Sequence, residues 1–96
     1  MKKFVLIHYG FVPPTPEIGA AWGKWFQDYG SMMVDNVGPL MGGKEVKDGQ
    51  VTDLPLGPES ITGMSIVNAA SWDEAMAMAK ANPAIHSCRV YEQGAM

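Results

Sequence analysis

Short runs of apolar, β-branched and aromatic residues recur along the chain and predict four strands. Such side chains favour extended structure because they pack well on a pleated surface. Gly10 ends the first run and Gly38-Pro39 ends the second. The predicted strands are residues 3–9, 31–37, 61–68 and 85–92.

Two further segments have the spacing and the end signals of helices. In residues 16–29, apolar positions recur every three or four residues, and Thr15, followed by a proline, supplies an N-cap. Gly30 is expected to end this helix. Ser71 begins a capping box, with a glutamate three residues later, and the second helix is expected to stop before Pro83.

A β-hairpin is predicted between the second and third strands. Residues 44–46 and 50–52 flank an Asp48-Gly49 pair, which is typical of a tight hairpin turn. The complete order is β-α-β-(hairpin)-β-α-β, which is typical of a ferredoxin-like α+β sandwich. A chain of 96 residues builds one core, so we expect residues 1–96 to form a single domain.

The first strand is apolar on both faces, which predicts a homodimer. Phe4 and Leu6 point one way, and Val5 and Ile7 point the other way. Two helices cover only one face of a four-stranded sheet, and a soluble monomer rarely exposes a large apolar face. We expect the same face of a second copy to cover it, as in a dimeric α/β barrel. The alternative is that residues 38–60 fold back over that face.

The composition excludes several classes of function. The net charge is −3 and the chain has no run of Lys or Arg, which argues against a nucleic-acid partner. No stretch approaches the roughly 20 apolar residues of a membrane span. Cys88 is the only cysteine, so neither an intrachain disulfide nor a cysteine-based zinc cluster is possible. A cytoplasmic location is expected by elimination.

His8 is the first candidate for chemistry, because it ends the first strand on the face of Phe4 and Leu6. A histidine oriented by a carboxylate acts as a general base, and Asp35 in the second strand is the expected partner. The alternative is a histidine that only satisfies a hydrogen bond within the fold. His86 is far away and no acid stands at ligand spacing, so we expect no metal site.

Aromatic residues on the first helix are candidates for a ligand wall. Trp22, Trp25 and Tyr29 lie on one stripe of the helix, where they form either a stacking surface for a flat ligand or part of the core. In the last strand, Arg89 needs a partner of opposite charge. That partner is an anionic group of a ligand, Glu92, or an acid of the second copy.

Several short motifs resemble the YCII-related (YCII/DGPF) family over nearly the whole chain. They are the first strand, Gly38-Pro39-Leu40, residues 61–67, Ser71-x-Asp73-Glu74-Ala75, and Pro83 with Arg89-Val90-Tyr91-Glu92. The resemblance implies a ferredoxin-like fold assembled as a dimeric α/β barrel, with some relatives acting on small aromatic substrates. The family's proposed His–Asp pair uses a histidine of the first helix. Residues 16–29 contain none, so this pair is not carried over.

These observations lead to one hypothesis and one alternative. The hypothesis is a domain that binds a small aromatic or carboxylic metabolite between the first helix and the sheet, with cofactor-independent acid/base chemistry. Its candidate residues are His8 and Asp35 for catalysis, and Trp22, Trp25, Tyr29 and Arg89 for binding. No cofactor is expected. The alternative is a non-catalytic dimerisation or regulatory module, whose pocket is filled by its own side chains.

Overall fold

The computed structural model describes residues 1–94 and contains the predicted elements. The strands are β1 (Lys2–Tyr9), β2 (Met33–Val37), β3 (Gly43–Lys47), β4 (Gln50–Leu54), β5 (Ile61–Ala69) and β6 (Ser87–Glu92). The helices are α1 (Pro16–Tyr29) and α2 (Trp72–Ala81), and a short 3-10 turn, Gly30–Met32, follows α1. The predicted bounds therefore agree to within about two residues, which is the usual uncertainty of element ends.

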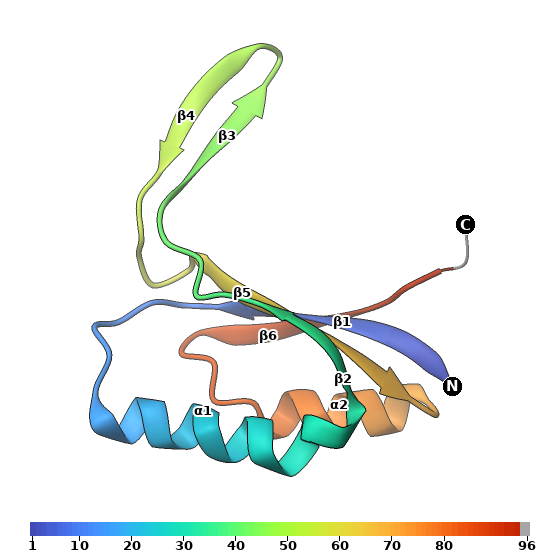
Figure 1. Cartoon of the computed structure of the whole chain (residues 1–96). Coiled ribbons are helices and arrows are strands. Elements are labelled where there is room, and N and C mark those ends of the chain that lie inside the picture. The colour runs from blue at the N-terminus through green and yellow to red at the C-terminus, as the bar shows by residue number, and fades with distance from the viewer. Residues whose placement is uncertain (95–96) are drawn as a thin grey trace.

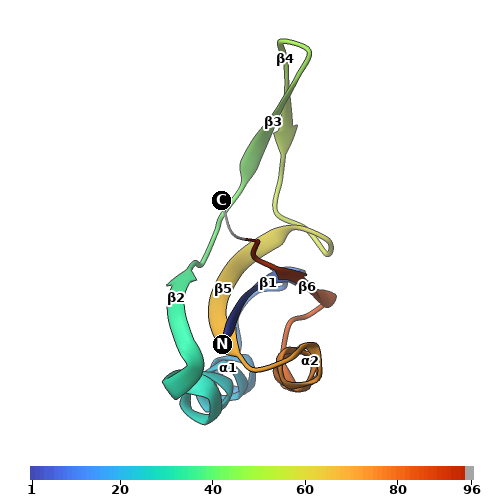
Figure 2. The same ribbon diagram turned by 90° about the vertical axis from the view of Figure 1, so that its right-hand side faces the viewer.

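The main sheet has the strand order β2-β5-β1-β6, with every neighbouring pair antiparallel. Both helices lie on one face of this sheet, as Figure 1 shows. The ferredoxin-like α+β prediction is thereby confirmed. β3 and β4 form a separate two-stranded ribbon that projects from the side of the sheet opposite the helices (Figures 1 and 2).

Local capping signals place both helices where the sequence predicts them. The Thr15 side chain accepts a hydrogen bond from the backbone N–H of Ile18 at 3.2 Å. Ser71 does the same for the N–H of Glu74 at 3.3 Å. Gly30 is not a left-handed cap, because its φ is −57° and the chain continues into the 3-10 turn. This delays β2, which begins at Met33 rather than at residue 31.

The core lies between the sheet and the two helices. Phe4 and Leu6 of β1 and Val67 of β5 are fully buried, and Met78 of α2 packs against them. Trp25 of α1 is also buried, and its indole Nε1 donates a hydrogen bond to the backbone carbonyl of Met78 at 2.9 Å. This bond satisfies the one polar atom that the indole carries into the core.

The opposite face of the sheet is left uncovered in the single chain. Val5, Ile7, Met64 and Ile66 lie on it and are only half-buried. Residues 43–54 are exposed along their length and project away from this face (Figure 2), so the alternative in which residues 38–60 fold back over it is not adopted.

Candidate functional site

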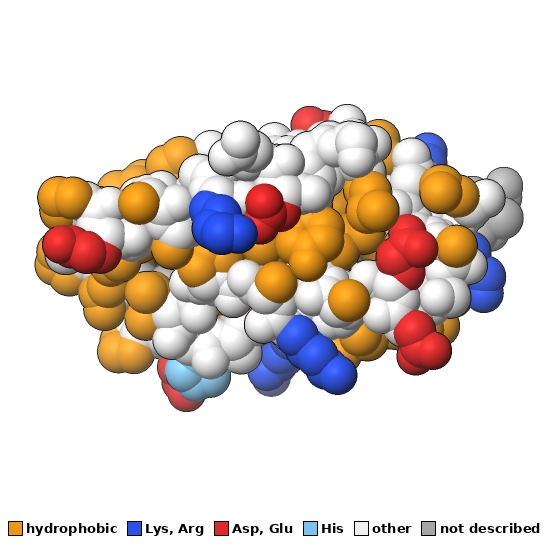
Figure 3. Space-filling view, turned by 90° about the horizontal axis from the view of Figure 1, so that it is seen from below, with side chains coloured by type: hydrophobic (Ala, Val, Ile, Leu, Met, Phe, Trp, Pro, Cys, Tyr) orange, Lys and Arg blue, Asp and Glu red, His pale blue; other side chains and the backbone are white. Residues whose placement is uncertain are grey.

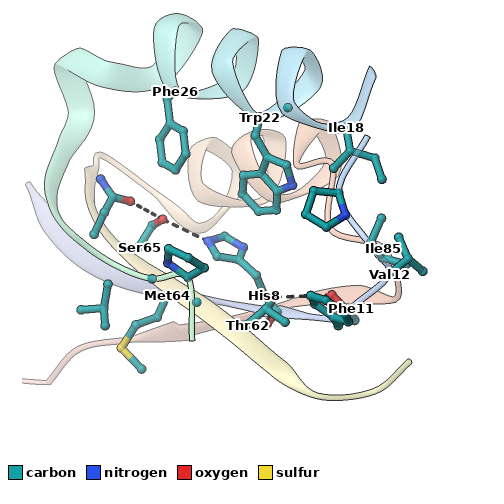
Figure 4. A pocket seen from close by; sticks show the side chains of 18 residues that line it. His8, Phe11, Val12, Ile18, Trp22, Phe26, Thr62, Met64, Ser65 and Ile85 are labelled. Atoms are coloured by element: carbon teal, nitrogen blue, oxygen red, sulfur yellow. Dashed lines mark hydrogen bonds between the residues drawn. The ribbon is translucent and has the colours of Figure 1, made fainter. Parts of the chain in front are cut away.

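A cavity of about 390 Å³ lies between α1 and the end of the main sheet. Most of its wall is apolar and comes from α1 and from the segments that follow β1 and precede β6 (Figure 4). The apolar wall includes Phe11, Val12, Ile18, Trp22, Phe26 and Ile85. A cavity of this size and lining is typical of a site for a small molecule.

Three linked polar side chains lie at the floor of this cavity. The His8 Nε2 is 3.0 Å from the Ser65 Oγ, and the Ser65 hydroxyl donates to the Asn36 Oδ1 at 2.5 Å. His8 and Ser65 are 4% and 1% exposed, so both are almost fully shielded from water. The dashed lines in Figure 4 mark this chain of hydrogen bonds below Trp22 and Phe26.

The direction of these hydrogen bonds fixes the form of His8. A hydroxyl carries one proton, and Ser65 gives it to the Asn36 carbonyl oxygen. Ser65 Oγ therefore accepts from His8, which places the imidazole proton on Nε2. The Nδ1 lone pair then faces the Cys88 thiol, whose Sγ lies 3.8 Å away.

Burial keeps both members of this His–Cys contact uncharged. Desolvation lowers the pKa of His8 from 6.5 to about 4, and the nearby side chain of Asn82 only partly offsets this effect. Desolvation also raises the pKa of the Cys88 thiol to about 11. At neutral pH the free protein thus holds a neutral imidazole next to a protonated thiol, which is not an activated nucleophile.

Close backbone approach shapes the floor of the cavity. Gly63 is paired with His8 across the two central strands, and a side chain there would bring a Cβ within 2.9 Å of the Val37 carbonyl oxygen. Gly38 has a φ of +147°, which disfavours any residue with a side chain. These glycines let the end of β2 lie directly against β5 beside His8.

The aromatic residues of α1 divide between the cavity and the core. Trp22 lines the cavity, with its ring in an edge-to-face contact 5.0 Å from the His8 ring centre. Trp25 belongs to the core, and Tyr29 packs against the core without lining the cavity. Phe26 takes their place in the wall. Phe26 belongs to the same aromatic stripe of α1. Helical spacing alone does not show which residues of the stripe face the cavity and which face the core.

Asp35 and Arg89 do not reach the cavity of their own chain. Asp35 pairs with Ile66 and so lies on the uncovered face, opposite to His8. The expected His8–Asp35 contact is therefore not formed. A register shift between Met33 and Asp35 causes this outcome. Because of this shift, Asn36 rather than Asp35 is paired with Ser65. Arg89 also lies on the uncovered face, with its guanidinium 4.7 Å from the Tyr9 ring centre.

Other kinds of site find little support in the part of the chain that the structure describes. Within residues 1–94, no three His, Cys, Asp or Glu side chains are grouped so that they hold a metal ion. No helix in this range has the length and apolarity that crossing a membrane requires. On the helix-covered side, the described Lys and Arg side chains are scattered among acidic and apolar ones (Figure 3).

Comparison with known proteins supports the fold. No family model matches this sequence, and no curated protein is significantly similar to it. The structure is similar to that of a 5-chloro-2-hydroxyhydroquinone dehydrochlorinase from Burkholderia phenoliruptrix AC1100, solved in complex with 2,5-dihydroxybenzoquinone. The TM-score is 0.58 at 14% identity, covering 96% of this chain and 93% of that chain. At this identity the similarity establishes a shared fold and no shared activity.

Proposed function

We propose that this protein binds a small aromatic molecule with polar substituents in the cavity beneath α1. The observation that carries the proposal is the combination of an aromatic wall with a polar floor. Trp22 and Phe26 offer ring faces and edges to a flat ligand. Below it lies the buried His8–Ser65–Asn36 chain, in which the Ser65 Oγ keeps a second lone pair that can accept a hydrogen bond. A cavity of about 390 Å³ suits a compound built on one ring.

The structural neighbour supports this class of ligand. It was solved with 2,5-dihydroxybenzoquinone, a one-ring compound that carries oxygens at its edge. The alternative of a non-catalytic module supposed that the pocket is filled by the protein's own side chains. An open cavity within a single chain favours ligand binding over that alternative.

Acid/base chemistry by His8 is the finer part of the proposal. With a pKa of about 4, the imidazole is a weak base in the free protein. A ligand oxyanion beside His8 would raise this pKa, because an adjacent negative charge favours the protonated ring. Binding of an acidic phenol would thus bring the imidazole closer to a useful range.

We also propose that the working form is a homodimer with the uncovered sheet faces packed together. The half-buried apolar side chains of β1 and β5 on that face support this assembly. Membership of the YCII-related family and a cytoplasmic location remain proposals as well, the first supported by the shared fold.

Ligand binding is tested by isothermal titration with matched one-ring compounds. The set comprises 2,5-dihydroxybenzoquinone, catechol, benzoate and the apolar control toluene. We expect at least one oxygenated ring to bind, and Ser65→Ala to weaken its binding about tenfold through the loss of a buried hydrogen-bonding group. Trp22→Leu removes the stacking surface and should weaken every aromatic ligand.

The control variant is Trp72→Phe, which changes an aromatic residue of α2 that does not line the cavity. It should bind like the wild type. The proposal fails if none of the compounds binds at millimolar concentration, or if Ser65→Ala and Trp22→Leu bind like the control variant.

A further inference from the structure

Two opposite charges lie at opposite edges of the uncovered sheet face. Asp35 belongs to β2, the strand at one edge, and Arg89 belongs to β6, the strand at the other edge. Cross-strand pairing shows that both share the face of Val5 and Ile7, because partners across a sheet point to the same side.

Neither charge is matched by another side chain within residues 1–94. Among the described residues, Asp35 accepts a hydrogen bond only from the backbone N–H of Asn36, at 2.8 Å, and forms no ion pair. Arg89 likewise forms no ion pair with a described residue and rests against the Tyr9 ring. Three strand spacings, about 14 Å in all, separate the two edge strands, so these side chains cannot meet within one sheet.

The pairing also defines the rows of side chains that cross the uncovered face. One row runs from Asp35 through Ile66 and Val5 to Tyr91. The next row runs from Val37 through Met64 and Ile7 to Arg89. Each row thus has an apolar centre and ends on β6 in a residue that can donate a hydrogen bond.

If the strands of the two sheets are aligned, two packings of such faces about a two-fold axis are possible. An axis across the strands places β2 over the partner's β2, so that the two Asp35 carboxylates face each other and so do the two Arg89 guanidinium groups. An axis along the strands places β2 over the partner's β6, so that Asp35 faces the donors Tyr91 and Arg89 of the second copy. Like charges that approach each other in an apolar interface are costly, whereas opposite charges are stabilised there.

We infer that Asp35 pairs with the partner's Arg89 in a dimer whose two-fold axis runs along the strands. This inference rests on the proposed sheet-to-sheet dimer and adds its orientation and specificity. Val37 and Met64, which share the uncovered face, also line the cavity. In this dimer the partner's β6 lies over Val37 and its β1 lies over Met64, so the second copy completes the rim of the ligand site.

The test measures the mass of charge-reversed variants by light scattering after size-exclusion chromatography. We expect the wild type to be a dimer, and Asp35→Arg and Arg89→Asp each to raise the dimer dissociation constant about tenfold or more. An equimolar mixture of the two variants should restore dimers, because every contact in that heterodimer joins opposite charges. The double variant should dimerise like the wild type for the same reason.

The control is Asp28→Arg, the same charge reversal on the exposed surface of α1, which should leave the dimer unchanged. A circular dichroism melt of each variant identifies any that fail to fold, and the milder Asp35→Asn and Arg89→Gln then replace them, each weakening the dimer by a smaller factor. A monomeric wild type overturns the dimer and this inference together. A dimeric wild type whose single reversals dimerise normally, or whose mixture stays monomeric, overturns this inference alone.

Discussion

His8 shows how surroundings rather than residue type set the chemistry of a side chain. The rings of Trp22 and Trp25 pack edge-to-face around it, with centres 5.0 and 5.6 Å from its own. These contacts remove water from the imidazole, so the neutral form is favoured. Its hydrogen bond to Ser65 was not predictable, because that partner lies 57 residues further along the chain and serine carries no distinctive sequence signal.

The lowered pKa of His8 makes stability depend on pH in one window. Above pH 6.5 the histidine is neutral in both states, so it contributes no pH dependence. Between pH 6.5 and about 4 the unfolded chain binds the proton first, so the free energy of unfolding falls as the pH falls. The full loss is of the order of 3 kcal/mol. Urea unfolding at pH 7, 5.5 and 4.5 measures this fall.

The variant His8→Phe removes the titrating group but keeps a ring of similar size. We expect its unfolding free energy to fall less than that of the wild type over the same pH range. His86→Gln, which replaces the surface histidine, serves as the control and should follow the wild-type profile. Parallel profiles for His8→Phe and the wild type would show that burial of His8 does not control acid stability.

Gly63 provides a second prediction for a single residue. In Gly63→Ala the new Cβ would lie 2.9 Å from the Val37 carbonyl oxygen, so β2 must move away from β5. We expect a loss of about 1–3 kcal/mol in unfolding free energy, typical of overpacking, together with weaker ligand binding. Gly23→Ala is the matched control, since nothing lies within 4 Å of its added Cβ and alanine favours helix. It should gain about 0.5–1 kcal/mol. Equal effects in both variants would contradict the proposed tight contact.

Elements with local signals were predictable from the sequence, and those that depend on distant pairing were less so. α1 and α2 start at capping residues, and the hairpin turn at Asp48-Gly49 has positive φ at both positions, 51° and 76°. In β2 the bulge after Met33 depends on pairing with β5, and nothing in residues 33–37 reveals it. That single irregularity moved Asp35 to the uncovered face and brought Asn36 to the cavity.

The β3–β4 hairpin should open independently of the rest of the fold. Its strands pair with each other and with no strand of the main sheet, and a lone two-stranded ribbon is marginally stable. Gly49→Val places a β-branched residue at a φ of 76°, which costs about 1–2 kcal/mol. We expect about tenfold faster amide hydrogen exchange in residues 43–54, with an unchanged melting temperature for the main sheet.

Gly43→Val is the control for this experiment. It adds the same side chain to the same hairpin, at a strand position where a Cβ meets nothing within 4 Å. Its exchange should remain close to that of the wild type. A melting temperature that falls by several degrees in Gly49→Val alone would show that the hairpin is coupled to the body of the protein.

At the scale of the whole molecule, the two faces of the sheet have different tasks. The helix-covered face holds the core and, at its end, the polar floor of the cavity. The uncovered face holds apolar side chains with Asp35 and Arg89 at its edges. Val37 and Met64 belong to the uncovered face and also border the cavity. Assembly and ligand binding should therefore be coupled through this shared rim.

The variant Ile66→Lys tests this coupling. Ile66 lies next to Asp35 on the uncovered face and does not line the cavity, so its direct effect on a ligand is small. A lysine there would be buried without a partner in the dimer, so we expect a monomer whose melting temperature no longer depends on protein concentration. Because the monomer lacks the partner's part of the rim, its ligand affinity should fall about fivefold or more. Met76→Lys, on the exposed surface of α2, should keep both the dimer and the affinity. A monomeric Ile66→Lys variant that binds the ligand as tightly as the wild type would mean that one chain forms the complete site.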